Sequence, residues 1–240
     1  MRWFELNGKS FSMVLFDMDG CLIDSEYLNI RLWGEVFNEH NVPIDHEEML
    51  NWRGWDFKAV VNRIEEAAHK PGSADGFRKE RDKRFWKAME MGDLKLKANV
   101  LDILSALDAN GIPYACVTST HSFKADVILK YFDIYDRFKF VLTGDAVQKL
   151  KPDPELYLKA IAMSDTPSDS VLVFEDSKHG IKAARSANLN VVYVIDRDPI
   201  DVSELECLDV VESFSQILEK MHWKDDEVVM WKHCENNNLD

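Results

Sequence analysis

The sequence predicts an α/β protein built on a doubly wound parallel sheet, with a helical domain inserted after the first strand. Two observations carry this prediction. Short apolar segments rich in β-branched or aromatic residues alternate along the chain with amphipathic helical segments, a pattern typical of parallel strands joined by helices. The interval between the first two of these strands is far longer than one crossover connection requires, which indicates an insertion.

The expected strands are apolar runs that are too short for helices and do not alternate with polar residues. They occupy residues 13–16, 114–117, 140–142, 171–174 and 191–195. Runs of this kind are typical of strands that are buried on both faces. They therefore favour a parallel sheet covered by helices on each side.

The expected helices of the sheet domain are recognised by their apolar spacing. Residues 100–107 carry apolar side chains at i, i+3, i+4 and i+7, and Asn110-Gly111 supplies a helix stop. Similar patterns occupy residues 122–131, 154–163 and 180–187. Pro154 suits the first helical position, because a proline lacks the N–H that would be unsatisfied there.

The insertion is expected at residues 23–92, with hinges near 22–24 and 92–94. Its apolar residues recur at helical spacing, and a turn is expected at residues 70–73. The sheet domain then comprises residues 11–22 and 93–222. The tail, residues 223–240, holds an apolar cluster at 228–231, and we interpret it as an edge strand followed by a disordered end.

Charge and composition restrict the classes of partner. The chain of 240 residues has 29 Lys and Arg against 43 Asp and Glu, which gives a formal net charge of −14. A negative field repels phosphate backbones, so we expect neither nucleic acid nor a membrane as partner. A small phosphorylated ligand held by a metal is compatible with this charge.

The apolar stretches and the cysteines predict the compartment. The longest apolar stretches are far shorter than the ~20 residues of a membrane-spanning helix, and the start of the chain has no apolar signal region. Cys21, Cys116, Cys207 and Cys234 are widely scattered, which favours reduced thiols over disulfides or a zinc site. We expect a cytoplasmic protein.

Polar residues follow each of the first four expected strands. They are Asp17-Met18-Asp19-Gly20, then Thr118-Ser119-Thr120, then the loop around Lys151, then Glu175-Asp176. The carboxyl ends of parallel strands meet at one edge of the sheet, where ligands bind in open α/β folds. Each group alone has an ordinary alternative: solvated acids or a solvated lysine, or a helix cap. Their joint placement favours a single active site.

With these motifs the chain resembles the haloacid dehalogenase superfamily of aspartate-nucleophile phosphotransferases. The similarity covers about residues 11–221 and is greatest to the branch with an inserted helical cap, which includes phosphoglycolate phosphatase-like and β-phosphoglucomutase-like enzymes. The resemblance implies a Rossmann-like catalytic core and assigns each motif a role. Asp17 is the nucleophile, Asp19 the general acid and base, Thr118 and Ser119 the phosphate ligands, and Lys151 the bridge between nucleophile and phosphate. The resemblance also implies that Mg²⁺ would be held by Asp17, Asp176, Glu175 and the backbone carbonyl of Asp19.

Physical chemistry favours the same roles. A phosphate monoester repels a bare carboxylate, so attack by Asp17 requires a divalent cation and a lysine. Asp19 can protonate the leaving oxygen and then deprotonate the water that cleaves an aspartyl phosphate. We therefore expect a Mg²⁺-dependent phosphatase that hydrolyses a small phosphorylated metabolite, such as a sugar or polyol phosphate, through an aspartyl-phosphate intermediate. We expect it to act as a monomer.

The helical cap is expected to select the substrate. Trp52, Arg53 and Trp55 flank a glycine and are candidates for substrate contact, although the tryptophans could instead pack the cap. Asn29 and Phe57 stand where the β-phosphoglucomutase pattern has a histidine and an arginine. A phosphomutase is therefore an alternative that the sequence disfavours. A catalytically silent binding or regulatory module is a second alternative.

Overall fold

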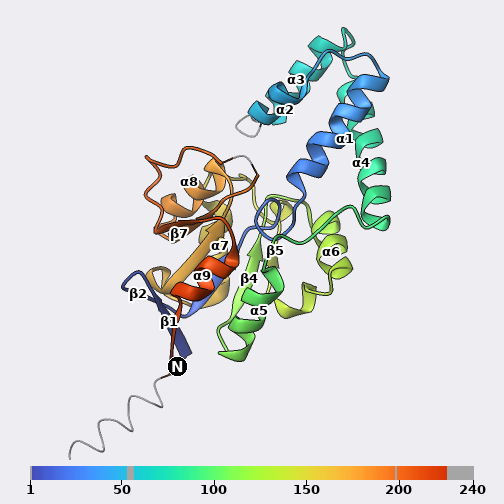
Figure 1. The fold of residues 1–240 in the computed structure, drawn as a ribbon. Coiled ribbons are helices and arrows are strands. Elements are labelled where there is room, and N and C mark those ends of the chain that lie inside the picture. The colour runs from blue at the N-terminus through green and yellow to red at the C-terminus, as the bar shows by residue number, and fades with distance from the viewer. Residues whose placement is uncertain (1, 53–56, 198, 226–240) are drawn as a thin grey trace, which may run out of the picture. The chain divides into compact units, whose positions relative to one another are not determined.

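The chain forms two compact units (Figure 1). The computed structural model describes residues 2–52, 57–197 and 199–225. The core unit comprises Met1–Leu22 and Lys97–Asp240, and the helical unit comprises Ile23–Leu96. The helical unit extends beyond the expected boundary at residue 92, because Ile23 and Leu96 form an antiparallel bridge. The N–H of Asp24 also donates to the carbonyl of Lys95 at 2.9 Å.

The core unit contains a six-stranded sheet with the order β5-β4-β3-β6-β7-β8. Every neighbouring pair of these strands is parallel, which confirms the predicted fold class. The strands are β3 (Met13–Phe16), β4 (Tyr114–Val117), β5 (Val141–Leu142), β6 (Val171–Glu175), β7 (Asn190–Val194) and β8 (Asp209–Val211). Five of them lie at predicted positions, and β8 was not predicted.

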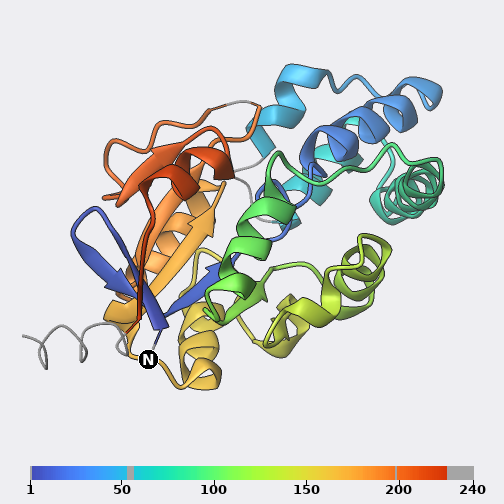
Figure 2. The ribbon, with the colours of Figure 1, turned by 60° about the horizontal axis from the view of Figure 1, so that its bottom comes forward.

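Helices cover both faces of this sheet, as Figure 2 shows. Alternate residues of a strand point to opposite faces. Leu15 belongs to a cluster with residues of α7 (Glu155–Ser164) and α8 (Lys178–Ser186). Phe16 points the other way and packs on Phe174 and on Phe214 of α9 (Phe214–Lys220), with ring centroids 5.1 and 5.8 Å away.

The remaining helices of the core unit also follow the predicted pattern. The helix α5 (Val100–Ala109) ends where Asn110-Gly111 predicts, and Gly111 has a positive φ of 62°. The helix α6 (Ser122–Tyr131) has the predicted bounds. Pro154 lies one position earlier than predicted, at the N-cap of α7. Single 3₁₀ turns occupy Tyr135–Arg137, Gly144–Ala146 and Ser168–Ser170.

A second, three-stranded antiparallel sheet joins the two ends of the described chain in the order β2-β1-β9. Its strands are β1 (Arg2–Leu6), β2 (Lys9–Phe11) and β9 (His222–Asp225). Phe4, Leu6 and Phe11 are fully buried, so this sheet is part of the packed core unit. The expected apolar cluster at 228–231 lies outside the described residues.

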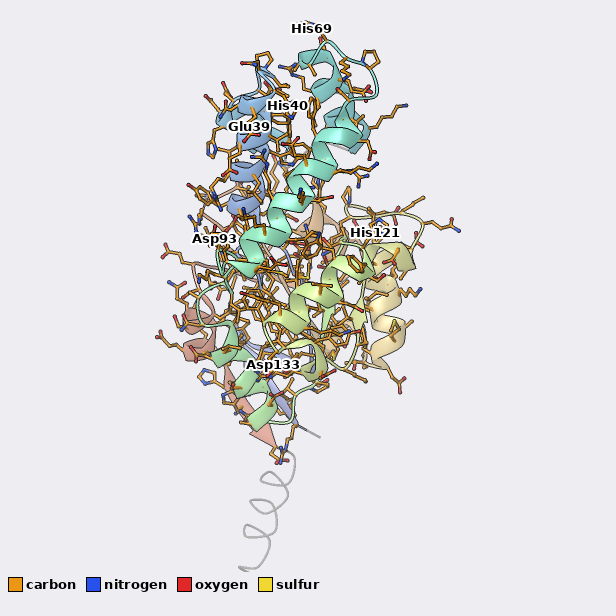
Figure 3. The ribbon with its side chains drawn as sticks, turned by 90° about the vertical axis from the view of Figure 1, so that its right-hand side faces the viewer. Glu39, His40, His69, Asp93, His121 and Asp133 are labelled. Carbon is orange, nitrogen blue, oxygen red and sulfur yellow. The ribbon has the colours of Figure 1, made fainter. Side chains whose placement is uncertain are left out.

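The helical unit consists of α1 (Glu26–Glu39), α2 (His46–Asn51), α3 (Phe57–Ala67) and α4 (Ala74–Glu90). Phe37, Trp52 and Ile64 belong to its apolar cluster. Glu39 and His40 lie at the carboxyl end of α1 (Figure 3). Each unit thus has an apolar cluster of its own.

The cysteines of the core unit are consistent with the expected thiol chemistry. Cys21, Cys116 and Cys207 are free thiols, and the first two are buried. Burial raises the pKa of both Cys21 and Cys116.

Among the helices in the described ranges, none combines the length and the apolar character needed to cross a membrane.

Candidate active site

The loop after β3 carries the two aspartates that the sequence singled out. Asp17 follows the last residue of β3, and its N–H donates to the carbonyl of Phe174 at 2.9 Å. Its side chain is therefore held at the edge of the sheet, where Asp17 is only 7% exposed. Gly20 then turns the chain with a φ of +79°, and a Cβ at this position would lie 2.1 Å from Asp176 Oδ2. Only a glycine allows the loops after β3 and β6 to approach this closely.

Lys151 reaches the same point from the loop after β5. Its Nζ donates to Asp17 Oδ1 at 2.5 Å, to Glu175 Oε1 at 2.7 Å and to the carbonyl of Val117 at 2.9 Å. Burial lowers the pKa of Lys151, but the attraction of the Asp17 and Glu175 carboxylates outweighs this effect and holds it above the ordinary value. Lys151 is therefore buried among acceptors that favour its charged form.

Three carboxylates gather here, and two of them, Asp17 and Glu175, are paired with Lys151. Asp17, Glu175 and Asp176 each offer an oxygen, and these oxygens all lie within 4.8 Å of one another. Burial raises the pKa of Asp17, and the attraction of Lys151 opposes the shift only in part. Because buried like charges repel, a bound cation would favour the charged form of these carboxylates.

Glu175 connects the lysine to the start of α8. Its carboxylate is fully buried and accepts hydrogen bonds from Lys151, from Tyr157 Oη at 3.0 Å and from Ser177 Oγ at 3.1 Å. A Cβ on Gly180 would lie 1.7 Å from Glu175 Oε1, so this glycine leaves room for the carboxylate. Tyr157 and Gly180 were not among the predicted site residues.

The loop after β4 carries the predicted phosphate ligands, Thr118 and Ser119. Thr118 is 1% exposed, and its Oγ1 accepts the N–H of Thr120 at 3.1 Å. The hydroxyl of Thr118 thus keeps its own proton for another acceptor, such as a phosphate oxygen. Thr120 Oγ1 in turn donates to Asp19 Oδ2 at 2.6 Å.

The alternative that Thr118 and Ser119 cap the following helix is wrong. His121, which is labelled in Figure 3, occupies the N-cap position of α6. The N–H of Ser122 is bound by Asp145 Oδ1 at 3.0 Å instead. The cap therefore comes from the loop after β5, and it leaves both residues of the β4 loop for another role.

The predicted substrate contacts of the helical unit are placed only in part. Trp52 is 9% exposed and packs in the apolar cluster of the helical unit, with its ring centroid 5.9 Å from that of Phe37. Arg53 and Trp55 lie outside the described residues. Of the core-unit residues that the sequence singled out, Lys151, Asp17, Glu175 and Asp176 meet in one cluster. Asp19 and Thr118 are both hydrogen-bonded to Thr120.

Comparison with known proteins identifies the family of the chain. A family model described as haloacid dehalogenase-like hydrolase matches residues 14–194. The chain is 31% identical over 183 residues to a phosphorylated carbohydrates phosphatase of Thermotoga maritima, which covers 75% of this chain and 83% of the relative. It is 30% identical over 210 residues to (DL)-glycerol-3-phosphatase 2 of Arabidopsis thaliana, which covers 84% of this chain and 86% of the relative.

A solved structure shows the same fold. A haloacid dehalogenase hydrolase from Entamoeba histolytica matches with a TM-score of 0.74 and 24% identity, over 86% of this chain and 95% of that one. The family model covers most of the chain, including all of the strand ends that carry the site. The chain belongs to the haloacid dehalogenase-like hydrolase family.

Proposed function

We propose that the protein is a Mg²⁺-dependent phosphatase that hydrolyses a small sugar or polyol phosphate through an aspartyl-phosphate intermediate on Asp17. The observation that carries this proposal is the buried Lys151, which holds the Asp17 carboxylate beside two further carboxylates. The names of two relatives, a phosphatase of phosphorylated carbohydrates and a glycerol-3-phosphatase, support the substrate class.

The donor set of the site suits Mg²⁺. This ion prefers one or two carboxylates together with waters and a phosphate oxygen. Asp17, Asp176 and the backbone carbonyl of Asp19 are the proposed ligands, with Glu175 beside them. When bound, the ion supplies positive charge that offsets the repulsion between a carboxylate and a phosphate ester. The proximity of the Asp17, Glu175 and Asp176 carboxylate oxygens supports this assignment.

The residues of the chain divide the reaction between them. A carboxylate oxygen of Asp17 attacks phosphorus, and the bond between phosphorus and the ester oxygen breaks. Asp19 donates a proton to the leaving oxygen, and Lys151, Thr118 and Ser119 hold the phosphoryl oxygens. Water then attacks the phosphorylated Asp17 and gives a proton to Asp19, which releases inorganic phosphate and restores both aspartates.

A panel of phosphorylated metabolites tests this proposal. Purified protein is incubated with sugar phosphates, polyol phosphates and other small phosphate esters, with Mg²⁺ or with a chelator, and released phosphate is measured. We expect release only with Mg²⁺, and highest for a sugar or polyol phosphate. An isomeric sugar phosphate in place of free phosphate would indicate a phosphomutase, and no turnover of any ester would favour a silent module.

A further inference from the structure

We propose that Thr120 is a positioning residue that holds the Asp19 carboxylate for proton transfer, and that Thr120 is itself held by the turn after β5, the 3₁₀ turn Gly144–Ala146. This inference rests on the proposed function, in which Asp19 is the general acid and base. It adds Thr120 to the proposed active site, because the family resemblance assigned roles to Thr118 and Ser119 but none to Thr120.

The contact joins two loops that are far apart in sequence. Thr120 Oγ1 donates to Asp19 Oδ2 at 2.6 Å across 101 residues of chain. The loops are neighbours because β3 and β4 pair in parallel, with Phe16 opposite Cys116. Both residues are half-buried, where a hydrogen bond to a charged oxygen is stronger than one between neutral groups. The bond restricts the rotation of the Asp19 side chain.

The backbone of Thr120 is held on both sides. Its N–H donates to Thr118 Oγ1 at 3.1 Å, and its carbonyl accepts the N–H of Gly144 at 3.0 Å. A Cβ on Gly144 would lie 2.2 Å from the carbonyl oxygen of Ser119, so the two loops touch backbone to backbone. The direction of the Thr120 hydroxyl is therefore set by the turn after β5.

Asp145 fastens this turn to the start of α6. Its Oδ1 accepts from the Ser122 N–H at 3.0 Å and from Thr143 Oγ1 at 2.6 Å, and its Oδ2 accepts from Ser122 Oγ at 2.6 Å. Hydrogen bonds from Ser122 and Thr143 hold the pKa of Asp145 below its ordinary value. Thr120 thus connects this turn to Asp19: its carbonyl binds the turn, and its hydroxyl binds the Asp19 carboxylate.

A positioning role predicts a dependence on the leaving group. The leaving oxygen of an alkyl ester must receive a proton as it departs, so this step depends on a well-placed Asp19. Nitrophenolate is a stable anion and leaves without a proton from Asp19. A residue that bound the phosphoryl group would affect both kinds of ester equally. The ratio of kcat/KM for the two kinds of ester separates the roles, because kcat/KM reports the step that phosphorylates Asp17.

The test compares Thr120→Val, which removes the hydroxyl and keeps the shape, with Thr120→Ser, which keeps the hydroxyl. For glycerol phosphate we expect Thr120→Val to lower kcat/KM about 10- to 100-fold, a part of the ~10²–10⁴ that a general acid contributes. For p-nitrophenyl phosphate we expect a change of less than about threefold. Thr120→Ser should restore most of the loss, and the inhibition constant of inorganic phosphate should not change.

Equal losses for both esters, together with weaker inhibition by phosphate, would overturn the proposal. Crystal structures of the three proteins give a readout that does not depend on turnover. We expect the Asp19 carboxylate to change rotamer in Thr120→Val and to keep it in Thr120→Ser; an unchanged Asp19 in Thr120→Val would refute the positioning role. Failure of the proposed function would show differently, as a wild-type protein that releases phosphate from no ester.

A second pair of variants tests the turn after β5. Asp145→Ala removes the hydrogen bonds to Ser122 and Thr143, whereas Asp126→Ala removes a carboxylate of α6 whose side chain is 37% exposed. We expect Asp145→Ala to lower the ratio of alkyl to aryl ester turnover, by less than Thr120→Val does, and Asp126→Ala to leave it unchanged. If Asp145→Ala lowered the melting temperature but left the ratio of alkyl to aryl ester turnover unchanged, Asp145 would act only as a helix cap. This result would overturn the proposed role of the turn after β5.

Discussion

One ion cluster of the core unit and one of the helical unit lie in opposite surroundings. In the core unit, the side chains of Lys151, Asp17 and Glu175 are 5%, 10% and 0% exposed. In the helical unit, Arg84 joins Glu39 and Glu80, whose side chains are 59% and 34% exposed. The first group is enclosed at the ends of strands, and the second lies along the surfaces of α1 and α4.

This difference in burial indicates that the two ion clusters have different roles, one in the reaction and one at the surface. A buried ion cluster costs several kcal/mol of desolvation, and well-packed apolar residues would often serve the fold as well. The cluster around Lys151 is therefore best explained by its reaction. Exposed ion pairs contribute little to folding, and the stability of the helical unit comes from its apolar cluster. Substitutions should thus affect turnover in the first unit and unfolding in the second.

The largest effect is expected for Asp17→Asn. An amide is neither a nucleophile nor an anionic metal ligand, and loss of a nucleophile lowers kcat by up to ~10⁶. Phosphate release measures the loss, and circular dichroism checks that the variant folds. Acid-quenched wild-type protein should carry phosphate on Asp17. Retention of more than about a thousandth of the wild-type rate would exclude Asp17 as the nucleophile.

The next largest effect is expected for Lys151→Ala. Loss of one preorganised charge that stabilises the phosphoryl oxygens should lower kcat about 10²- to 10³-fold. Lys149→Ala is the matched control, because the Lys149 side chain lies two residues earlier in the same loop and is 73% exposed. Equal losses in the two variants would show that the buried lysine is not the functional one.

In the helical unit, Trp52→Ala should lower the free energy of unfolding by about 3–5 kcal/mol, the usual cost of removing a buried aromatic ring. Thermal or urea unfolding measures this change. The predicted substrate contact of Trp52 is tested by the same variant. Unchanged discrimination between a sugar phosphate and p-nitrophenyl phosphate would assign the ring to packing alone, whereas a selective loss for the sugar phosphate would support contact.

The smallest effect is expected for Arg84→Ala. Hydrogen bonds from Arg84 lower the pKa of Glu39, and those from His40 and Arg84 lower the pKa of Glu80. A carboxylate with a lowered pKa stabilises the fold above its ordinary pKa, and this stabilisation disappears as the pH falls through the lowered value. The melting temperature should thus fall by less than about 2 °C at neutral pH. If the difference in melting temperature between the wild type and Arg84→Ala persisted at low pH or at 1 M salt, it would contradict a surface ion-pair effect.

Most of the large sheet could be predicted because its strands are apolar on both faces. The sequences of β3 and β4 are uninterrupted apolar runs, and each strand has the predicted bounds. β8 (Asp209–Val211) was missed because a three-residue strand with an exposed centre has no such run. The hairpin of β1 and β2 had a signal that was not used. Asn7-Gly8 has positive φ at both positions, which is the turn that this dipeptide favours between two strands.

The site could be predicted to the level of motifs. Asp17 and Lys151 follow strands, and Glu175 ends one, at the same sheet edge, so the topology alone brings them near one another. Tyr157 was missed because its position on α7 reads as a core residue, and its hydroxyl is within reach of Glu175 only after the helix packs on the sheet. Asp145 was missed for a similar reason, since an acidic residue in a loop is ordinary in sequence.

The sequence by itself determined the alternation of five strands of the large sheet with helices and the edge at which the polar motifs gather. Apolar periodicity and strand-end carboxylates are local features, and a parallel sheet converts them into proximity without further information. Only the tertiary structure decided which atoms meet. The hydrogen bond from Thr120 to Asp19 and the room that Gly180 leaves for Glu175 depend on how closely the loops and helices pack. Hydrogen bonds weaken steeply with small changes in distance and angle, and such differences arise only when all the elements are packed together.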